Sequence, residues 1–348
     1  MKKVAGLIRQ DSGVGFYRLV QPLRFLKRTG LIKDARMSWF SGDNIWGEKD
    51  GRLVMEEKLF YNICKDADVI WSNFTAVRDD MLRMLDARKQ FNSKLILDID
   101  DNLYAVHRDN PVARSADVFI KEIELSLKIA DGLTVSVPTL KKLYEPLNKN
   151  IFVQPNGIDL KLWKPKHKKN KKLKIGWRGA YGHLPDLNLI KSAIEAICKD
   201  YDCEFVTFGA KPDFTFTGHS HIEPVGLVEF PKKIAQANFD IGVVPLIDSS
   251  YNRCKSNLNI LEFSALKVPV VASPTENQKD MKCLYATSNY EWYEKLERLV
   301  KDEMLRKKVA EEQYNDLLNR FDMNKLVKPL SEWMDKLERR RDLEPDRK

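Results

Sequence analysis

The sequence predicts an α/β protein made of two doubly wound domains, each with a parallel β-sheet between layers of helices. First, short apolar runs alternate with longer amphipathic segments along nearly the whole chain, as strands alternate with helices in such a fold. Second, these runs are largely apolar along their length, which is typical of strands that are covered on both faces. Third, the lysine-rich residues 164–174 interrupt the alternation, which then begins again, so the 348 residues divide into two domains.

In the first half, each predicted helix follows a predicted strand. The strands are short and apolar: 3–9, 35–40, 68–73, 94–100, 132–137 and 151–155. The helices carry apolar residues three and four positions apart: 16–28, 51–64, 77–90, 118–130 and 138–147. Strands that are separated by helices pair in parallel, because each connection must cross over the sheet.

The second half repeats this order and ends in helices. The predicted strands are 172–179, 203–209, 239–246, 268–273 and a short one within 283–288. The predicted helices are 184–200, 230–238, one that begins near 258, 289–302, 303–320 and 323–341. These elements place a first domain at 1–163, a linker at 164–174, a second domain at 175–318 and a C-terminal helix at 319–348.

The composition indicates a globular protein of a reducing compartment. The balance of 43% hydrophobic and 31% charged residues is ordinary for a globular domain. No apolar run reaches the roughly 18 residues of a membrane-spanning helix. The five cysteines include no Cys-x-x-Cys pair, and the five histidines are not grouped with other metal ligands. We therefore expect a cytoplasmic protein without a disulfide framework or a metal site.

The lysine-rich linker holds most of the net charge of +9. A run of this kind is most often a solvated connection between domains. It is also suited to an anionic partner: a membrane surface, a nucleic acid or a phosphorylated substrate. The sequence favours the first interpretation and leaves the second open, including a peripheral contact with the inner face of a membrane.

The turn after the first strand is a candidate phosphate site. Gly13 and Gly15 are able to adopt positive φ and to let a ligand approach the backbone closely. A helix that begins near Tyr17 and Arg18 favours an anion at its N-terminus. The three-glycine pattern of dinucleotide sites is incomplete, so an ordinary turn explains the sequence equally well.

Three acids follow the fourth strand: Asp98, Asp100 and Asp101. Carboxylates this close raise one another's pKa, bind cations or accept hydrogen bonds from sugar hydroxyls. Helix capping and solvation is the alternative. We favour a site, because ligands of open α/β sheets bind beyond the carboxyl ends of the strands.

The second domain opens with the turn "IGWRGAYGHLPDL", in which glycines again follow a strand. Arg178 is suited to hold a diphosphate through two parallel hydrogen bonds. We interpret His183 as a histidine of a helix start or loop without a role in binding.

The segment 252–273 combines a loop, a helix and a strand. Ser256 and Asn257 are typical of a helix N-cap or first turn, and Lys255 adds a positive charge there. Glu262 lies further along a helix that is apolar nearly all round, so we expect it to be buried and to need partners. A carboxylate there would suit ribose hydroxyls, and a surface Glu on an amphipathic helix is the alternative.

These motifs, in this order, resemble the GT-B glycosyltransferases, specifically the large retaining group known as group 1 or family four. The segment "DIGVVPLIDSSYNRCKSNLNILEFSALKVPVVAS" is similar to the donor site of that group. Three shorter segments also resemble it, and the resemblance extends over nearly the whole chain: "VQPNGIDLKLW", "SGVGFYRLVQPLRFL" and "LILDIDDNLY".

The resemblance implies transfer of a sugar from a nucleotide-diphosphate sugar to an acceptor hydroxyl, with retention and without a cofactor or an essential metal. The second domain would bind the donor and the first the acceptor, and the last helix, around Trp333, would cross back to the first domain. The resemblance further implies roles for individual residues. Lys255 and Arg178 would face the diphosphate, and Ser256, Asn257 and Leu258 would offer it their backbone N–H groups. Glu262 would bind the ribose, and Gly13 and Gly15 would approach the donor phosphates. Asp100 and Asp101 would join Lys255 in catalysis. The acceptor would be contacted by Tyr17, Arg18 and His107.

The sequence departs from the family at two positions. The family has two glutamates, and the first of them falls on Cys254 here, which puts the contact with the donor sugar in doubt. Trp177 stands where the family has a phosphate-binding arginine. The acceptor is expected to be a surface glycan or a lipid-linked sugar. Modified DNA bases, a non-catalytic sugar-nucleotide scaffold and a nucleotide-sugar epimerase are the alternatives.

Overall fold

The computed structural model describes residues 1–9, 12–38, 46–49, 52–106, 113–165 and 168–340. The chain divides into two compact units. The first comprises 1–104, 114–156 and 323–348, and the second comprises 105–113 and 157–322. The boundary between them therefore falls at 156/157, where the sequence suggested 163/164.

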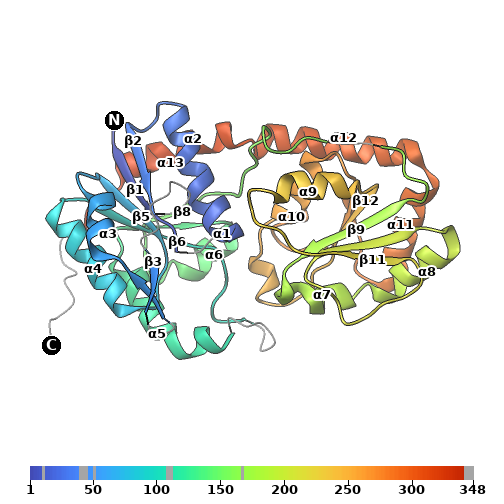
Figure 1. Ribbon diagram of the computed structural model, residues 1–348, viewed down its shortest axis with the longest axis horizontal. Helices are drawn as coiled ribbons and strands as arrows, with labels where there is room; N and C mark the ends of the chain where they lie inside the picture. The colour runs from blue at the N-terminus through green and yellow to red at the C-terminus, as the bar shows by residue number, and fades with distance from the viewer. Residues whose placement is uncertain (10–11, 39–45, 50–51, 107–112, 166–167, 341–348) are drawn as a thin grey trace. The chain divides into compact units, whose positions relative to one another are not determined.

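The first unit is built on a parallel sheet with the strand order β2-β1-β5-β6-β7-β8 (Figure 1). Its strands are β1 (Lys3–Leu7), β2 (Asp34–Met37), β5 (Val69–Asn73), β6 (Lys94–Ile99), β7 (Gly132–Val135) and β8 (Ile151–Val153). Its helices are α1 (Gly13–Gly15), a π-helical turn (Phe16–Val20), α2 (Gln21–Arg28), α3 (Glu57–Cys64), α4 (Arg78–Gln90), α5 (Ala113–Ile129), α6 (Pro138–Tyr144) and α13 (Met323–Lys336). The alternation predicted from the apolar runs is confirmed here.

One predicted helix of this unit is wrong in its first half. Residues 51–64 were expected to be helical, but β4 (Arg52–Met55) pairs antiparallel with β3 (Trp46–Lys49), and only Glu57–Cys64 form a helix. The run of Leu and Val in β4 is too short to distinguish the spacing of a helix from that of a strand. The pairing with β3 decides between the two.

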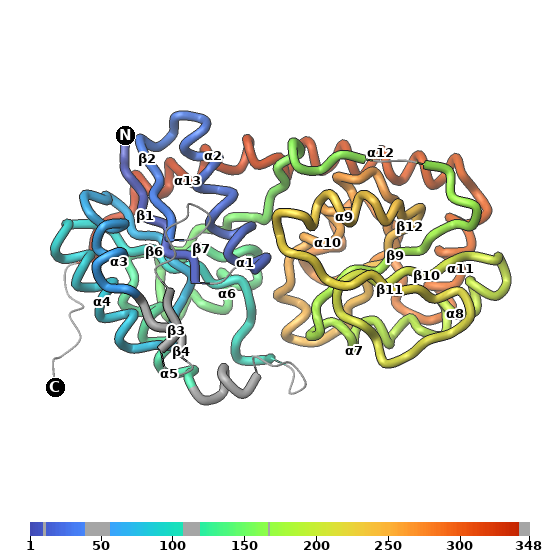
Figure 2. The backbone as a smooth tube through the Cα atoms, viewed as in Figure 1, coloured from blue at the N-terminus to red at the C-terminus, as the bar shows by residue number. Residues whose placement is uncertain are grey.

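The last helix, α13, belongs to the first unit and lies beside α2 (Figure 2). Trp333, on which the sequence argument centred, stacks on Phe152 of β8 with ring centroids 5.4 Å apart. A Cβ on Gly132 would lie 2.9 Å from the Trp333 ring, so this glycine is required by the packing of the helix on the sheet. Lys2 adds a hydrogen bond from Nζ to the carbonyl of Ser331.

The second unit contains a parallel sheet with the order β11-β10-β9-β12-β13-β14. Its strands are β9 (Lys174–Gly179), β10 (Glu204–Gly209), β11 (His219–Ile222), β12 (Ile241–Val244), β13 (Val270–Ala272) and β14 (Leu284–Tyr285). Its helices are α7 (Leu184–Asn188), α8 (Lys191–Tyr201), α9 (Phe230–Ala237), α10 (Leu258–Ala265), α11 (Asn289–Lys301) and α12 (Glu303–Arg320), with short 3₁₀ turns at Tyr181–His183 and Asn252–Cys254. Strand β11 was missed, because its sequence His-Ser-His-Ile is polar and it lies at the edge of the sheet.

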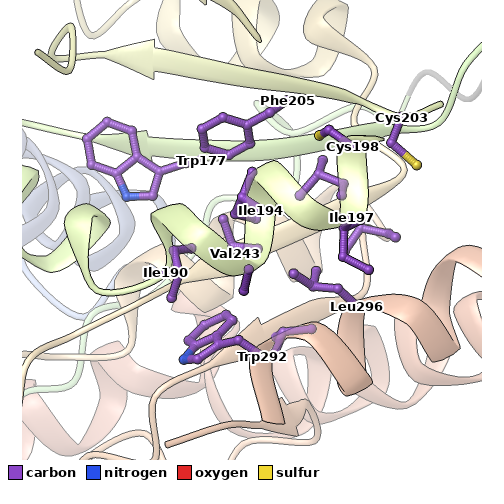
Figure 3. Packing of buried hydrophobic residues seen from close by; sticks show 14 of the residues in the cluster. Trp177, Ile190, Ile194, Ile197, Cys198, Cys203, Phe205, Val243, Trp292 and Leu296 are labelled. Carbon is purple, nitrogen blue, oxygen red and sulfur yellow. The ribbon is translucent and has the colours of Figure 1, made fainter. Parts of the chain in front are cut away.

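The core of this unit forms where α8 packs between the sheet and α11 (Figure 3). Trp177 and Phe205 come from the strands, Ile194 from α8 and Trp292 from α11, and all four are buried. Each large apolar side chain buried in this way contributes about 1.5–3 kcal/mol to stability. The glycine of "IGW" has a packing role as well, since a Cβ on Gly176 would lie 2.4 Å from the Phe239 ring.

The lysine-rich segment is part of the second unit from residue 168 onward. Asn238 accepts a hydrogen bond from the backbone N–H of Lys168 (3.0 Å), and Asp240 accepts one from Lys174 (2.8 Å). The side chain of Asn170 donates to Asp240 at 2.7 Å. This part of the segment is therefore held against the domain and is not the solvated connection that the sequence favoured. Most of its lysine side chains remain exposed.

Candidate functional site

The candidate site of the second unit lies at the carboxyl ends of β9, β12 and β13, which are neighbours in the sheet. The chain leaves β12, forms the 3₁₀ turn Asn252–Cys254, and enters α10 at Leu258. Asn257 is the N-cap residue of α10, in keeping with the sequence prediction. Glu262 is 1% exposed, which agrees with the expectation that it is buried.

The start of α10 is held by the loop that follows β13. The side chain of Asn277 donates to the backbone carbonyls of Arg253 (2.7 Å) and Lys255 (3.2 Å). Gln278 donates to the carbonyl of Ser256 at 3.2 Å. Asn257 makes no side-chain capping bond, because its amide is turned toward the sulfur of Met281. The backbone carbonyls of the residues before α10 are thereby bound by these side chains. The N-terminal dipole of this eight-residue helix lies at the carboxyl edge of the sheet.

The two cations next to α10 have different surroundings. Arg253 is exposed and binds Asp248 through two hydrogen bonds of 2.7 and 2.8 Å, which lowers the pKa of that carboxyl. The Nζ of Lys255 lies 4.4 Å from the centroid of the Tyr251 ring and is held there by a cation–π contact. Lys255 is thus the cation positioned beside the helix start.

Arg178 and Glu262, to which the family resemblance assigned separate roles, form an ion pair with each other. Glu262 is buried, and the Arg178 side chain is 17% exposed and lies 5.6 Å from the centroid of the Phe230 ring. A buried carboxylate requires a cation or several donors, and Arg178 at the end of β9 supplies the charge. The strand and the helix are far apart in the sequence, so no local pattern indicated this pair.

We expect the Glu262→Gln variant to unfold with a free energy about 1–3 kcal/mol lower, because the guanidinium of Arg178 loses its counter-charge. A double-mutant cycle with Arg178→Gln, measured by urea denaturation, should give a coupling of about 0.5–3 kcal/mol. Two single losses that simply add would contradict a direct interaction.

A second cluster in this unit centres on Asp186 of α7, which is 3% exposed. It accepts hydrogen bonds from the backbone N–H of Ile247 (2.8 Å) and the amide of Asn252 (2.7 Å), and its Oδ2 lies 2.8 Å from the Nδ1 of His183. The sequence argument gave His183 no role and did not consider Asp186. The His-x-x-Asp spacing at a helix start was the one available signal, since it places both residues on one face.

In the first unit, Arg18 and Asp98 form a buried ion pair that corrects two predictions. Nε and Nη2 of Arg18 donate to Asp98, the latter at 2.8 Å, and Nη1 donates to the carbonyl of Gln154 (2.6 Å) and to Oδ1 of Asn156 (3.0 Å). Thr134 donates to the same carboxylate at 2.7 Å. Both charged side chains are at most 1% exposed, so Arg18 is a structural residue rather than an acceptor contact, and Asp98 is not part of an open acidic site.

The structure also corrects the predicted roles of three other residues in the first unit. Tyr17 is 4% exposed and packs edge-to-face on Phe16, so its ring lies in the core and not toward an acceptor. Gly13 and Gly15 are helical, with Gly15 at φ −56°, and not in the left-handed region that the prediction invoked. The helix therefore begins at Gly13, in the connection that follows β1. A Cβ on Gly13 would meet open space, so its position still allows close approach.

Asp100 and Asp101 follow β6 at the carboxyl edge of the first sheet and are partly exposed. The hydroxyl of Tyr144 donates to the carbonyl of Asp101 at 2.7 Å and holds this turn in place. His107 lies outside the described residues. Arg9, at the end of β1, was not predicted: it contacts the buried Asp80 at 3.1 Å, and burial lowers the pKa of Arg9 while Asp80 opposes that shift.

Neither a metal cluster nor a membrane-spanning helix is found in the described part of the chain. No three His, Cys, Asp or Glu side chains there are grouped as metal ligands. None of the helices within the same residues is both long and apolar enough to cross a bilayer. A cavity of about 470 Å³ lies at the amino end of the first sheet, where Lys2, Asp68, Lys94 and Arg339 line it, and so at the opposite end of that sheet from Asp100 and Asp101.

No family model and no curated protein matches this chain. Solved structures do match. Alr3699/HepE from Anabaena, in complex with UDP-glucose, aligns with a TM-score of 0.69 at 11% identity over 97% of this chain and 100% of that one. A glycosyltransferase from Rickettsia africae aligns with a TM-score of 0.66 at 13% identity over 97% and 98% of the two chains. An α-glucosyltransferase in complex with UDP aligns with a TM-score of 0.68 at 11% identity over 96% and 100%.

The chain has the GT-B fold. The fold predicted from the strand–helix alternation and from the motif order is thereby confirmed. In this GT-B chain, the second sheet carries Lys255, Arg178 and Glu262 at its carboxyl edge, and the first carries Asp100 and Asp101 at its own. At 11–13% identity, the likeness establishes the fold and leaves the reaction to be argued from these residues.

Proposed function

We propose that the protein is a glycosyltransferase that transfers a sugar from a nucleotide-diphosphate sugar to an acceptor hydroxyl. The observation that carries the proposal is the start of α10, where Lys255 and the helix dipole converge beside the Arg178–Glu262 pair. A helix N-terminus with an adjacent cation is suited to a diphosphate in charge and in hydrogen-bond donors. UDP-glucose and UDP are bound by two of the proteins with the same fold, which supports a nucleotide sugar as the donor.

The proposed reaction breaks the bond between the anomeric carbon and the phosphate oxygen, and it forms a bond from that carbon to the acceptor oxygen. Negative charge develops on the leaving diphosphate, where Lys255 and the backbone N–H groups of Ser256, Asn257 and Leu258 would stabilise it. The proton of the acceptor hydroxyl passes to the departing phosphate, and the anomeric configuration is retained. Asp100 or Asp101 would position the acceptor hydroxyl or, in place of the departing phosphate, take its proton as the base.

Donor binding would require Arg178 and Glu262 to exchange partners. The guanidinium would turn to the diphosphate, and the carboxylate would accept a hydrogen bond from a ribose hydroxyl. Each group then replaces one charged or polar partner by another, so neither is left buried and uncompensated. Cys254 is buried beside this region, and the contact that a family glutamate would make with the donor sugar must come from another residue.

We propose a surface glycan or a lipid-linked sugar as the acceptor. A modified DNA base is the second candidate, because an α-glucosyltransferase of the same fold was solved with UDP and a 13-mer DNA that contains an HMU base. The exposed lysines of residues 168–171 would suit the phosphates of DNA or an anionic membrane surface that presents a lipid-linked sugar. Binding to DNA through them should weaken steeply as salt is raised, whereas binding to an uncharged glycan should not.

Thermal-shift measurements with UDP-, GDP-, ADP- and dTDP-sugars test the proposal. A stabilisation by one nucleotide class is expected, and product analysis with that donor then separates transfer from epimerisation. A non-catalytic scaffold would be stabilised without forming product. If no nucleotide sugar changes the melting temperature, the proposed function is wrong.

A further inference from the structure

The arrangement of His183 and Asp186 indicates more than a loop histidine. Asp186 is buried, and its Oδ1 accepts hydrogen bonds from the backbone N–H of Ile247 and from the amide of Asn252, while its Oδ2 lies 2.8 Å from the Nδ1 of His183. A carboxylate oxygen pairs with the edge of an imidazole that bears the proton. The Nδ1 of His183 therefore carries the proton in its 2.8 Å contact with Asp186.

This contact leaves Nε2 as the outer nitrogen of His183. The side chain is 23% exposed, and its contact with Asp186 holds the ring at the Nδ1 edge. A phosphate oxygen placed at Nε2 would meet an N–H of the ring in a direction that the contact with Asp186 fixes.

The same carboxylate connects His183 to the approach of α10. Asp186 binds the amide of Asn252, and the carbonyl of Asn252 accepts a hydrogen bond from the backbone N–H of Lys255 at 3.0 Å. His183 and Asp186 follow β9, and Asn252 follows β12, which pairs with β9 in the sheet. Two successive hydrogen bonds thus hold the histidine turn and the lysine turn together at adjacent strand ends.

We propose that His183 is a diphosphate-binding residue of the donor site, and that Asp186 is the residue that positions it. This inference rests on the proposed function, since it assigns the site a nucleoside diphosphate. It adds a hydrogen-bond donor whose direction is fixed by the fold to the charge that Lys255 supplies. Asp186 acts through His183 and through the loop, and does not itself contact the ligand.

Substitution of His183 by an amide residue distinguishes the contribution of Nδ1 from that of Nε2. In His183→Asn the amide nitrogen takes the place of Nδ1, so the bond to Asp186 is kept while Nε2 is lost. In His183→Gln the amide nitrogen takes the place of Nε2 as a neutral donor. The probes are UDP, ADP, GDP and dTDP and the corresponding nucleosides. The affinity of each variant is measured by titration calorimetry for the diphosphate that the wild type binds most tightly and for its nucleoside. His219→Asn, at another half-buried histidine of the same unit, is the matched control.

We expect His183→Asn to weaken binding of the nucleoside diphosphate by about 10–100-fold, which is the usual effect of one charged hydrogen bond, and to leave nucleoside binding unchanged. His183→Gln should recover part of the loss, and His219→Asn should alter neither affinity. Asp186→Asn should weaken diphosphate binding in the wild type but add little in the His183→Asn background. Equal losses for nucleoside and diphosphate, or no loss, would overturn the inference while the proposed function stands. If the wild type binds none of the four diphosphates, both fall together.

Discussion

The Asp98→Ala variant should lose about 3–5 kcal/mol of its free energy of unfolding, because the substitution leaves the Arg18 guanidinium charged and buried. Arg18 would keep its bonds to Gln154 and Asn156, but neither partner carries a charge. The hydroxyl of Thr134, which donates to Asp98, would lose its acceptor as well. Urea denaturation followed by circular dichroism measures the change.

Asp79→Ala is the matched control for this prediction. Asp79 is an exposed carboxylate in the first turn of α4, and its removal should change stability by no more than about 1 kcal/mol. The double variant Arg18→Leu/Asp98→Leu should lose less than the sum of the single changes, since it leaves no uncompensated charge. An Asp98→Ala variant as stable as the control would show that water or another group solvates Arg18.

The Lys255→Ala variant should lower the rate of sugar transfer by about 10²–10³-fold, which is the effect of removing one positioned donor from a developing negative charge. The Nζ of Lys255 is held beside the start of α10 by the Tyr251 ring, so its side chain is oriented before a donor binds. Initial rates of transfer with the nucleotide sugar selected by the thermal-shift screen measure the effect. Affinity for the nucleoside alone should be unchanged.

Lys267→Ala serves as the control for Lys255→Ala. Lys267 follows the other end of α10, and its Nζ binds Glu311 at 2.8 Å and lies over the Tyr314 ring. It has the same charge and a similar aromatic contact, but it lies at the helix terminus where a diphosphate would not bind. Full transfer activity in Lys255→Ala would rule out the assignment of the diphosphate to this helix start.

Much of the fold could be predicted because its signals are local. The buried strands of both sheets are short apolar runs, and the helices carry apolar residues at helical spacing, so neighbouring residues suffice to identify them. The strands that were missed are short or polar: β3 and β4 have four residues each, the second within a stretch interpreted as helix, and β11 is a polar edge strand. In each case a neighbouring strand supplies the hydrogen bonds that local periodicity does not indicate.

The sequence by itself also determined where the candidate site lies. The order of strand, polar turn and helix placed Ser256, Asn257 and Lys255 at the start of α10, and the apolar surroundings of Glu262 indicated its burial. What only the tertiary structure decided is which charges face one another. Arg18 pairs with Asp98, which lies 80 residues away in the sequence. Arg178 on β9 pairs with Glu262 on α10, and Asp186 of α7 binds Asn252 in the turn before α10. A buried charge is stable only with a partner. In a parallel sheet that partner lies on the segment that the crossover connections bring next to it, and no pattern of neighbouring residues specifies which segment this is.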